Sequence, residues 1–509
     1  MLNERRTTSI IRRIINAIIT LIFILLQLAL YTILYFEIYA STYVQLIAYI
    51  LGVILVMYIL QTRYNSSYKI SWIVLILLFP VFGTLMYLFV GAYHPLPERK
   101  IKKINAYIKD YIPVSKTADE VFQDDLVAKK HAKILQKQAP VGLYTNTAIE
   151  YYKDPVPKYN DMIEKLKNAK NYIFMEYFII SDGFLWNDIL EILLEKARAG
   201  VEVKIIYDDI GSLRSLDKGG IKRLNKNPNF RMVAYNPMGI KVSLGLNYRD
   251  HRKAVIIDGE YAYSGGDNIA DEYIHKLIRF GKWRDTGFRL TGDAVKQYIL
   301  MFVEMWYMST KEMLDAKQYI KETNVLSDAV HIPFGDGPHN KVELSYDVVT
   351  SMVDNSQKYL YISTPYLIVN REFILNIAKL SESGVKVVIL VPKIPDKKIT
   401  FWLTQAHYKD ILAAGGKIYE YTPGFNHAKM VLSDDKYLLL GTINMDFRSF
   451  FLNFESGDLI IGDEVIKEVK KDFEEQLAIS KEVTYEEWCK RPLIKKIVQF
   501  VLYIFAVLF

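Results

Sequence analysis

A chain of 509 residues is too long for one ordinary domain, so more than one folded unit is expected. Lys plus Arg exceed Asp plus Glu by only seven (64 − 57), which fits an anionic membrane surface or a phosphate substrate and does not demand nucleic acid as a partner. The single cysteine, Cys489, excludes an intrachain disulfide, and the eight histidines do not combine with it into a zinc-binding cluster.

Three apolar runs dominate residues 1–92, which we predict to be an α-helical transmembrane region. The runs are Ile14–Phe36, Val44–Leu60 and Ile70–Val90, and the absence of a polar face argues against buried core helices. The first run lacks a convincing small-residue cleavage site, so a cleaved signal peptide is not expected. Basic residues before the first run and after the second predict that both places lie in the cytoplasm.

The third run leaves two topologies open. Basic residues follow it on the side that would be extracellular if it crossed the bilayer, against the usual bias. Pro80 and Gly83 interrupt the run, which favours a re-entrant hairpin whose freed backbone groups are buried in protein. A complete crossing is the alternative.

Residues 93–139 are charged and rich in lysine, as is typical of a juxtamembrane linker, and from about Pro140 the pattern becomes α/β. The apolar segments Tyr172–Ile180 and Val201–Asp208 are predicted strands, and Asn187–Ala199 between them is a predicted helix. A strand, a helix and a strand in this order predict a parallel pair with a crossover. Phe230–Tyr235 is expected to add another strand.

An eight-residue pattern, H-x-K-x4-D, then occurs twice. Its members are His251, Lys253 and Asp258 in HRKAVIID, and His427, Lys429 and Asp434 in HAKMVLSD. Each lysine is followed after 15 residues by an asparagine, Asn268 (268 − 253) or Asn444 (444 − 429). On a strand, the histidine and the lysine of each copy would project from the same face, and the aspartate would lie at the turn that ends the strand.

The second half of the chain repeats the first. Tyr359–Ile368 is similar in kind to Tyr172–Ile180, and Ser383–Pro392 is similar to the segment that contains Val201–Asp208. The offsets are nearly constant, 176 residues from His251 to His427 and 184 from Gly200 to Gly384, which indicates an internal duplication. We predict two similar α/β lobes, residues 140–330 and 331–490, packed about a pseudo-twofold axis so that both motifs meet in one cleft. Chance similarity of ordinary α/β segments is the alternative.

Two imidazoles and two ammonium groups suit a phosphodiester. Neither motif places a base beside a Ser or Cys nucleophile or has metal-ligand spacing. The lysines and asparagines would hold the phosphoryl oxygens, while one imidazole attacks phosphorus and the other protonates the leaving alcohol. The alternative is two unrelated surface strands that each carry a His and a Lys.

These residues resemble the double HKD motif of the phospholipase D superfamily. DFRSFFLNFES, with Arg448, Ser449, Asn453 and Glu455, and the membrane segment SWIVLILLFPVFGTLMYLFVG are similar to those of bacterial cardiolipin synthases. The resemblance implies that two phosphatidylglycerol molecules become cardiolipin plus glycerol, without metal or cofactor, with His251 as the nucleophile and His427 as the acid and base. A phospholipase D hydrolase, a phosphatidylserine synthase and a non-catalytic lipid-binding scaffold remain open. Asn426 departs from the apolar residue usual before the second histidine.

Five further residues are assigned to substrate binding, each with a structural alternative. Glu176 and Tyr177 end a predicted central strand, and Tyr366 lies in the matching segment of the second lobe. Packing in the core is the alternative for these residues. Asp285 and Glu455 would each accept the ring N–H of a catalytic histidine and fix its tautomer, with salt bridges to arginine or lysine as the alternative.

Residues 491–509 close the chain with a basic flank and the apolar stretch Ile497–Phe509. Thirteen residues are too few to span a bilayer upright, so we predict an interfacial anchor on anionic lipid, with a helix docked on the protein as the alternative. Together the sequence predicts a multi-pass protein of the bacterial cell membrane with its catalytic lobes in the cytoplasm. It leaves the oligomeric state open, a homo-oligomer included.

Overall fold

The computed structural model describes residues 42–62, 65–91, 98–112, 117–213, 215–237, 247–323, 325–340 and 342–506. The backbone divides into two compact units, Met1–Ala92 and Tyr93–Phe509, which we describe separately. The predicted first apolar run, Ile14–Phe36, lies outside the described residues.

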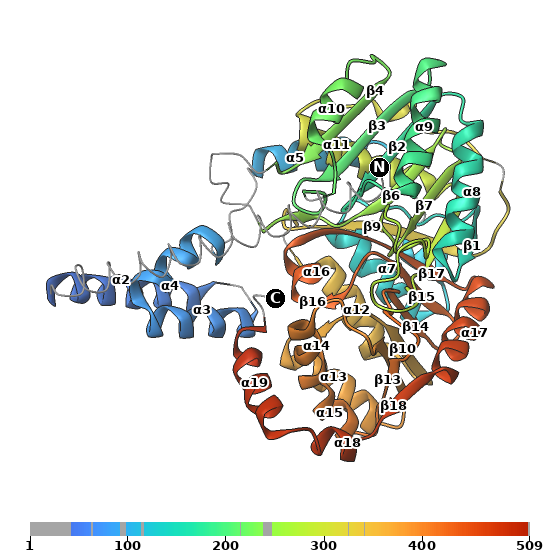
Figure 1. Cartoon of the computed structure of the whole chain (residues 1–509). Helices are drawn as coiled ribbons and strands as arrows, with labels where there is room; N and C mark the ends of the chain where they lie inside the picture. Colours follow the sequence, from blue (N-terminus) through green and yellow to red (C-terminus); the bar gives the residue numbers. More distant parts are fainter. Residues whose placement is uncertain are drawn as a thin grey trace. The chain divides into compact units, whose positions relative to one another are not determined.

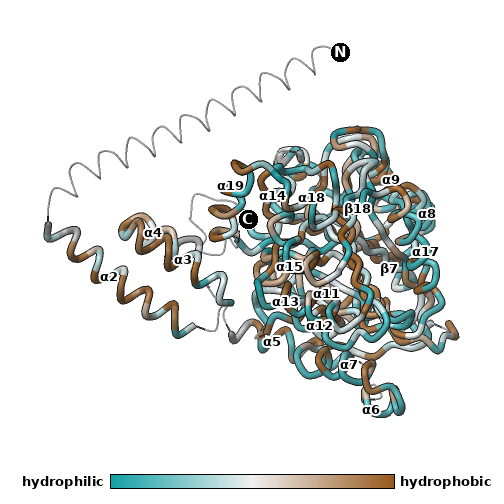
Figure 2. The backbone as a smooth tube through the Cα atoms, turned by 90° about the horizontal axis from the view of Figure 1, so that it is seen from below, coloured by the Kyte–Doolittle hydropathy of each residue, from teal (hydrophilic) through white to brown (hydrophobic). Residues whose placement is uncertain are grey.

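The described part of the first unit consists of short apolar helices (Figure 2). They are α2 (Thr42–Gln61), α3 (Ser66–Leu78), α4 (Pro80–Met86) and the π-helix η1 (Tyr87–Gly91). The third apolar run is interrupted at the expected place, because α3 ends at Leu78 and Pro80 begins α4 at the position where a proline fits best. A side chain at Gly83 would lie 2.5 Å from the Leu75 carbonyl oxygen, so only glycine allows α4 to approach α3 this closely.

The membrane-spanning prediction is not confirmed by this part of the structure. Across the residues it describes, none of the helices combines the length and the hydropathy that a bilayer crossing requires.

The second unit contains two large sheets. The first has the strand order β1-β8-β7-β6-β2-β3-β4, with β2, β3 and β4 parallel and the other pairs antiparallel. Its strands are β1 (Thr147–Tyr152), β2 (Tyr172–Tyr177), β3 (Glu202–Asp208), β4 (Phe230–Tyr235), β6 (Lys253–Ile257), β7 (Tyr261–Gly265) and β8 (Gly287–Gly292). Its helices are α8 (Pro155–Asn168), α9 (Phe184–Arg198), α10 (Lys218–Leu224) and α11 (Val295–Thr310).

Read from the β4 edge, the second sheet repeats this order as β13-β12-β10-β14-β15-β17-β9, and β18 is an additional edge strand beside β13. Its strands are β9 (Val330–Asp336), β10 (Tyr359–Ser363), β12 (Lys386–Pro392), β13 (Lys417–Tyr421), β14 (Met430–Ser433), β15 (Tyr437–Gly441), β17 (Asn453–Ile461) and β18 (Ser480–Val483). Its helices are α12 (Leu344–Asn355), α13 (Arg371–Glu382), α14 (Lys398–Ala406), α15 (Tyr408–Ala413), α16 (Phe447–Phe451), α17 (Val465–Ala478), α18 (Tyr485–Cys489) and α19 (Leu493–Ile504).

Smaller elements complete the second unit. They are α5 (Glu98–Lys109), α6 (Ala118–Val121), α7 (Leu126–Gln138), β5 (Arg249–Asp250), the 3-10 helix η2 (Ala316–Gln318), and the paired strands β11 (Leu367–Ile368) and β16 (Met445–Asp446). The α/β prediction is confirmed. Strands from β2 to β8 correspond one by one to strands from β10 to β17, apart from the small strands β5, β11 and β16 (Figure 1).

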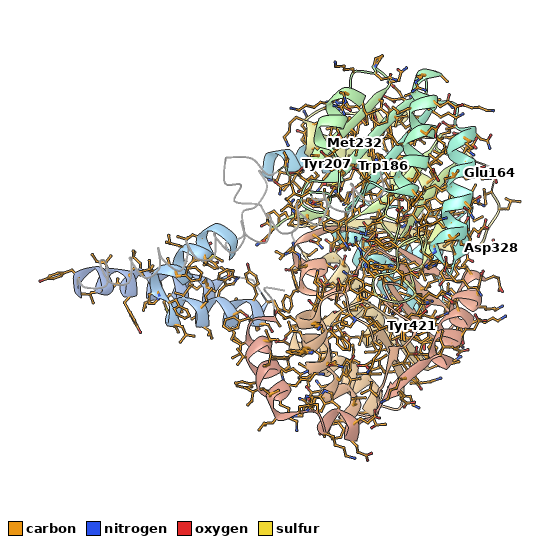
Figure 3. The ribbon with its side chains drawn as sticks, in the orientation of Figure 1. Glu164, Trp186, Tyr207, Met232, Asp328 and Tyr421 are labelled. Atoms are coloured by element: carbon orange, nitrogen blue, oxygen red, sulfur yellow. The ribbon has the colours of Figure 1, made fainter. Side chains whose placement is uncertain are left out.

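Three hydrophobic cores organise the lobes into layers. One lies between the two sheets and includes most of α11 together with Phe174 of the first sheet and Leu432 of the second. Another lies between the first sheet and helices α8 and α9, where Trp186, Tyr207 and Met232 gather in the upper lobe of Figure 3. The last lies between the second sheet and helices α7, α12 and α13. Because the sheets share the central core, the lobes are one packed unit, and residues of one lobe reach the other.

Backbone segments of the two lobes also pair with each other. The short strand β5 of the first lobe pairs with β17 of the second, and Arg284 of the first lobe forms a β-bridge with Asn426 of the second. His251 directly follows β5 and His427 directly follows Asn426, so each motif histidine lies at the seam between the lobes.

Candidate active site

The backbone at the seam holds each histidine against the opposite lobe. The His251 N–H donates to the Phe454 carbonyl (2.9 Å), and the His427 N–H donates to the Arg284 carbonyl (2.7 Å). Each histidine is therefore fixed at its backbone before its side chain makes any contact.

The side chain of each histidine also binds a residue of the opposite lobe. Nδ1 of His251 lies 2.9 Å from both carboxylate oxygens of Glu455, and Nδ1 of His427 lies 2.6 Å from Oδ2 of Asp285. A carboxylate at Nδ1 holds the proton there and leaves Nε2 with its lone pair free. Arg284 and Arg289 do not compete for Asp285, because they pair with Asp472 and Asp161.

The first of these carboxylates is held by a side-chain network. Glu455 accepts hydrogen bonds from Ser449 (2.7 Å), Asn453 (3.2 Å) and Thr442. The second is held through the backbone, since Asp285 Oδ1 accepts from the Thr286 N–H (2.9 Å). Both carboxylates are fully buried.

The motif lysines lie beside the histidines, as the strand periodicity predicts. Lys253 donates to the His251 carbonyl (2.6 Å), and Lys429 makes the same bond to the His427 carbonyl. Lys429 also reaches the first lobe: a side chain at Gly266 would meet its Cδ at 3.0 Å and the Asp285 carboxylate at 2.1 Å. Glycine at 266 is thus what allows the two lobes to close around this lysine.

Burial determines the protonation of the site. It lowers the pKa of both histidines well below the ordinary value, and the charges of Lys253 and Lys429 lower each of them further. The charge of His251 also lowers the pKa of His427. The two imidazoles are therefore close enough to influence each other's protonation. Burial lowers the pKa of Lys253 to about 7 and that of Lys429 to about 8, although nearby carboxylates oppose it. Both imidazoles are therefore neutral at neutral pH, as a nucleophile requires.

The motif aspartates, predicted to be catalytic, lie at the ends of β6 and β14 that are remote from the histidines, where their hydrogen bonds go to backbone N–H groups. Asp258 and Asp434 occupy the left-handed turns that end β6 and β14, with φ of 52° and 58°. Asp258 accepts from the N–H groups of Lys170, Asn171 and Tyr172, and Asp434 accepts in the same way from residues 357, 358 and 359. Each aspartate thus satisfies the free N–H groups at the start of the neighbouring strand.

The two asparagines differ. Asn268 uses its side chain within the protein, because Oδ1 accepts from the Ile179 N–H (3.1 Å) and Nδ2 donates to the Tyr273 hydroxyl (2.7 Å). Asn444 is also buried, but its Oδ1 has no hydrogen-bond partner among the described residues. A buried amide oxygen without a partner is costly, so Asn444 is the better candidate to contact a ligand.

Three other predicted substrate contacts are packed within the protein, and of these Tyr366 lies against Phe425, a ring beside His427 (6.5 Å between ring centres). Glu176 is buried next to Asp250, and burial raises the pKa of Glu176 well above the ordinary value. Tyr177 belongs to the core under α8 and α9. Tyr366 is partly exposed, and its hydroxyl donates to Asp396 (2.6 Å). Glu176 and Tyr177 take the structural alternative, because the face of β2 on which each lies is covered by other elements.

Aromatic rings that the sequence analysis missed surround the histidines. Phe178 lies 5.1 Å from the His251 ring, measured between ring centres. Three rings surround His427, those of Trp283 (5.5 Å), Phe425 (5.6 Å) and Tyr273 (5.9 Å). Phe178, Trp283 and Phe425 each lie within two positions of an assigned residue, and Tyr273 lies five positions after Asn268. Such proximity is too common to single out these rings without the fold.

Comparison with known proteins identifies the family. The family model described as "Cardiolipin synthase, PLD-like domain" matches residues 162–278 and 349–477, and the model described as "Phospholipase_D-nuclease N-terminal" matches residues 48–91. A cardiolipin synthase of Staphylococcus aureus is 33% identical over 454 residues, which cover 86% of this chain and 90% of that protein. The chain belongs to the cardiolipin synthase family. Cardiolipin synthase 2 of Bacillus cereus is 32% identical over 449 residues, 86% of each chain.

The phospholipase D-type architecture of this family is also seen in a solved structure. Phosphatidylserine synthase of Haemophilus influenzae superposes with a TM-score of 0.57 over 75% of this chain and 97% of its own. At 18% identity this likeness shows the fold alone.

Proposed function

We propose that the protein is a cardiolipin synthase that transfers a phosphatidyl group from one phosphatidylglycerol to a second, giving cardiolipin and glycerol. The observation that carries the proposal is the reciprocal seating of two neutral histidines, each bound at Nδ1 to a carboxylate of the opposite lobe. This arrangement provides two Nε2 atoms with free lone pairs, beside two lysines, and needs no other nucleophile.

In the first step, Nε2 of His251 attacks the phosphorus of the first lipid. A P–N bond forms, the P–O bond to glycerol breaks, and His427, whose protonated form is favoured once the anionic phosphodiester of the lipid is bound, gives its Nε2 proton to the departing oxygen. The product is a phosphatidyl-histidine. Lys253, Lys429 and Asn444 are the groups proposed to hold the phosphoryl oxygens as charge develops.

In the second step, the now neutral His427 removes the proton from the terminal hydroxyl of a second phosphatidylglycerol. The alkoxide oxygen attacks phosphorus, the P–N bond breaks, and the lone pair returns to His251. His427 ends the cycle protonated, ready for the next first step. Two phosphatidylglycerols have become cardiolipin and glycerol, with no net change in the enzyme.

Water would divert the intermediate to phosphatidic acid, so the site must favour a lipid hydroxyl. The rings of Trp283, Phe425 and Tyr273 around His427 support this preference, because they give the base an apolar surrounding. Phe178 gives the intermediate on His251 a similar neighbour.

Membrane attachment at both ends of the chain is part of the proposal. Residues 1–92 are the membrane region, 93–139 the linker to it, and 140–330 and 331–490 the catalytic lobes, which the basic flanks assign to the cytoplasm. The C-terminal segment, 491–509, contributes α19, whose exposed face carries Leu493, Ile494, Ile497, Phe500 and Val501.

Helix α19 carries apolar side chains on its exposed face, and the face that packs on the protein is mixed, with Leu502 against Leu403 beside the polar Gln499. Its buried residue Gln499 donates to the Trp402 carbonyl (2.9 Å) and accepts from Arg491 (2.6 Å), so a polar group faces the protein while apolar side chains face outward. An outward apolar face beside Lys495 and Lys496 suits an anionic lipid surface.

The test uses the full chain in phosphatidylglycerol vesicles, with lipid products and glycerol resolved. Cardiolipin and glycerol in equal amounts are expected. Phosphatidic acid alone would instead make the protein a hydrolase, phosphatidylserine formed only with added serine and a suitable donor would make it a serine transferase, and no turnover would leave a lipid-binding scaffold.

A further inference from the structure

Arg448 is an arginine near the site that forms no salt bridge with the described residues. Burial lowers the pKa of Arg448, and Asp446, Asp208 and Glu455 favour its charge only from beyond salt-bridge distance. Arg249, Arg252 and Arg284 pair with Asp208 (3.3 Å), Glu304 (3.1 Å) and Asp472 (2.5 Å). Arg448 donates one hydrogen bond, from Nη2 to the Asn247 carbonyl (3.1 Å), and no carboxylate in the described part of the chain lies within salt-bridge distance of it. The side chain is only partly exposed. A guanidinium that is largely withdrawn from water without an anion is unfavourable, so the position calls for one.

The guanidinium lies next to the His251 half of the site. The following residue, Ser449, donates to Glu455, the carboxylate that holds His251. Asn247, which accepts from Arg448, precedes His251 by four residues. The pKa of His251 is lowered mainly by burial and by the two motif lysines, and the charge of Arg448 lowers it further.

The equivalent position in the first lobe does not carry a cation. Arg448 lies four residues after Asn444, and the residue four positions after Asn268 is Glu272. Glu272 lies 3.8 Å from Arg279 and provides a negative charge where the second lobe provides a positive one. The extra cation therefore belongs to one side of an otherwise duplicated site.

The proposed reaction needs a binding group for a second anion. The two lysines serve the phosphorus that reacts, but an acceptor phosphatidylglycerol brings its own phosphodiester, three carbons from the attacking hydroxyl. That phosphodiester does not react and must be held within one headgroup length of the reacting phosphorus. An arginine is well suited to it, because its planar fork matches two phosphate oxygens.

We propose that Arg448 binds the phosphodiester of the acceptor lipid and so selects a phospholipid hydroxyl over water or glycerol as the acceptor. This inference rests on the proposed synthase function. It assigns Arg448 to acceptor binding and not to the formation of the phosphatidyl-histidine.

Two reactions of the same enzyme separate the assignments. Condensation of phosphatidylglycerol to cardiolipin needs the second phosphodiester. Exchange of isotopically labelled glycerol into phosphatidylglycerol uses the same intermediate and the same histidines, but its acceptor carries no phosphate. Exchange is also a measure of correct folding, because it requires the assembled site.

The full-length R448Q and R448K variants are compared with wild type in phosphatidylglycerol vesicles with labelled glycerol present. We expect R448Q to lose condensation by about 10- to 100-fold, as for a lost charge-assisted hydrogen bond, and to keep glycerol exchange within about 3-fold. R448K should recover part of the condensation rate, because the charge remains while the fork is lost. R279Q is the matched control, since it removes one positive charge from an exposed position, and both of its rates should stay near wild type.

Equal loss of exchange and condensation in R448Q would overturn the inference, because Arg448 would then serve the donor or the fold. An unchanged condensation rate would overturn it as well. A wild-type enzyme that makes no cardiolipin would instead contradict the proposed function. Cardiolipin synthesis by the wild-type enzyme is therefore measured before the variants.

Discussion

The two histidine seats of this protein use the same parts in different surroundings. In both, a histidine at the lobe seam binds a carboxylate of the other lobe, and a lysine two residues later donates to the histidine carbonyl. Around His427 the surroundings are aromatic. Around His251 there is one aromatic ring, a hydroxyl and amide network on Glu455, and Arg448.

The layer beneath the histidines differs even more. Under His251, Arg252 donates to both Glu304 and the Glu455 carbonyl, and Asp250 lies beside Glu176. At the equivalent places under His427, Asn426 donates to Ser363 (3.0 Å) and Ala428 replaces the arginine. Asn426 is thus a fully buried residue that precedes the second motif histidine and bonds to the neighbouring strand β10.

The two copies of the motif therefore keep the same reactive groups, whereas the residues around each histidine differ. An imidazole that carries a phosphoryl group and one that shuttles a proton benefit from different neighbours. The predictions below test whether the two seats differ in role as they differ in surroundings, from the largest expected effect to the smallest.

The largest effect is expected from the histidines themselves. H251A and H427A should each lower cardiolipin synthesis by at least about 10⁴-fold, because one removes the nucleophile and the other the acid and base. A phosphatidyl ester of nitrophenol distinguishes them, since its leaving group needs no proton. A rapid burst of nitrophenol should persist in H427A and be absent in H251A. A burst in H251A alone would reverse the two roles.

The cross-lobe carboxylates should come next. E455Q and D285N keep the size of the side chain but can donate to Nδ1, which would move the imidazole proton to Nε2. We expect losses of about 10²- to 10⁴-fold in kcat, with little change in KM. Equal losses in both variants would indicate equivalent seats. A retained nitrophenol burst in D285N, but not in E455Q, would match the proposed division of labour.

The buried lysines predict an alkaline limit. Because their pKa values in the folded protein are about 7 and 8, Lys253 and Lys429 lose their charge as pH rises through this range, and kcat/KM should fall by about tenfold per pH unit between the two values and by about a hundredfold per unit above both. The limit in kcat should lie at higher pH, since bound phosphate favours the charged lysines. An invariant kcat/KM from pH 7 to 9 would contradict the protonated role.

The same shifts fix the sign of a stability change. The folded-state pKa values lie below the ordinary 10.5, so between about pH 7 and 10.5 the unfolded chain binds more protons. The contribution of these lysines to the free energy of unfolding therefore rises with pH over that window and is lost as pH falls through the folded-state values. The K429M variant should show a smaller slope of this kind in denaturant titrations at several pH values.

The turn aspartates should have the smallest effect on catalysis. D258A and D434A should each lower the free energy of unfolding by about 0.5–1.5 kcal/mol, because the N–H groups at the start of the neighbouring strand lose their acceptor but can still reach water. D258N and D434N should lose less, since asparagine keeps one acceptor oxygen and tolerates positive φ. The rate per folded molecule should remain within about 3-fold of wild type. A selective loss of rate without a loss of stability would restore the aspartates to the active site.

Sequence alone determined the chemistry of this protein. Spacing of two residues put each lysine beside its histidine, because strand periodicity is a local property of the backbone. The offset of 176 residues predicted two lobes with matching strands, and the family pattern around Arg448 predicted the reaction.

Only the tertiary structure decided which groups cooperate. Glu455 follows the second motif along the chain but holds the first histidine, and Asp285 follows the first but holds the second, because Glu455 near the start of β17 and Asp285 just before β8 both lie at the seam between the lobes. The same reason separates the aspartates of the motif from its histidines: they lie at opposite ends of one short strand. The histidine and carboxylate partners lie 204 and 142 residues apart in the sequence and meet because the two sheets pack together. A local sequence pattern contains no information about such packing.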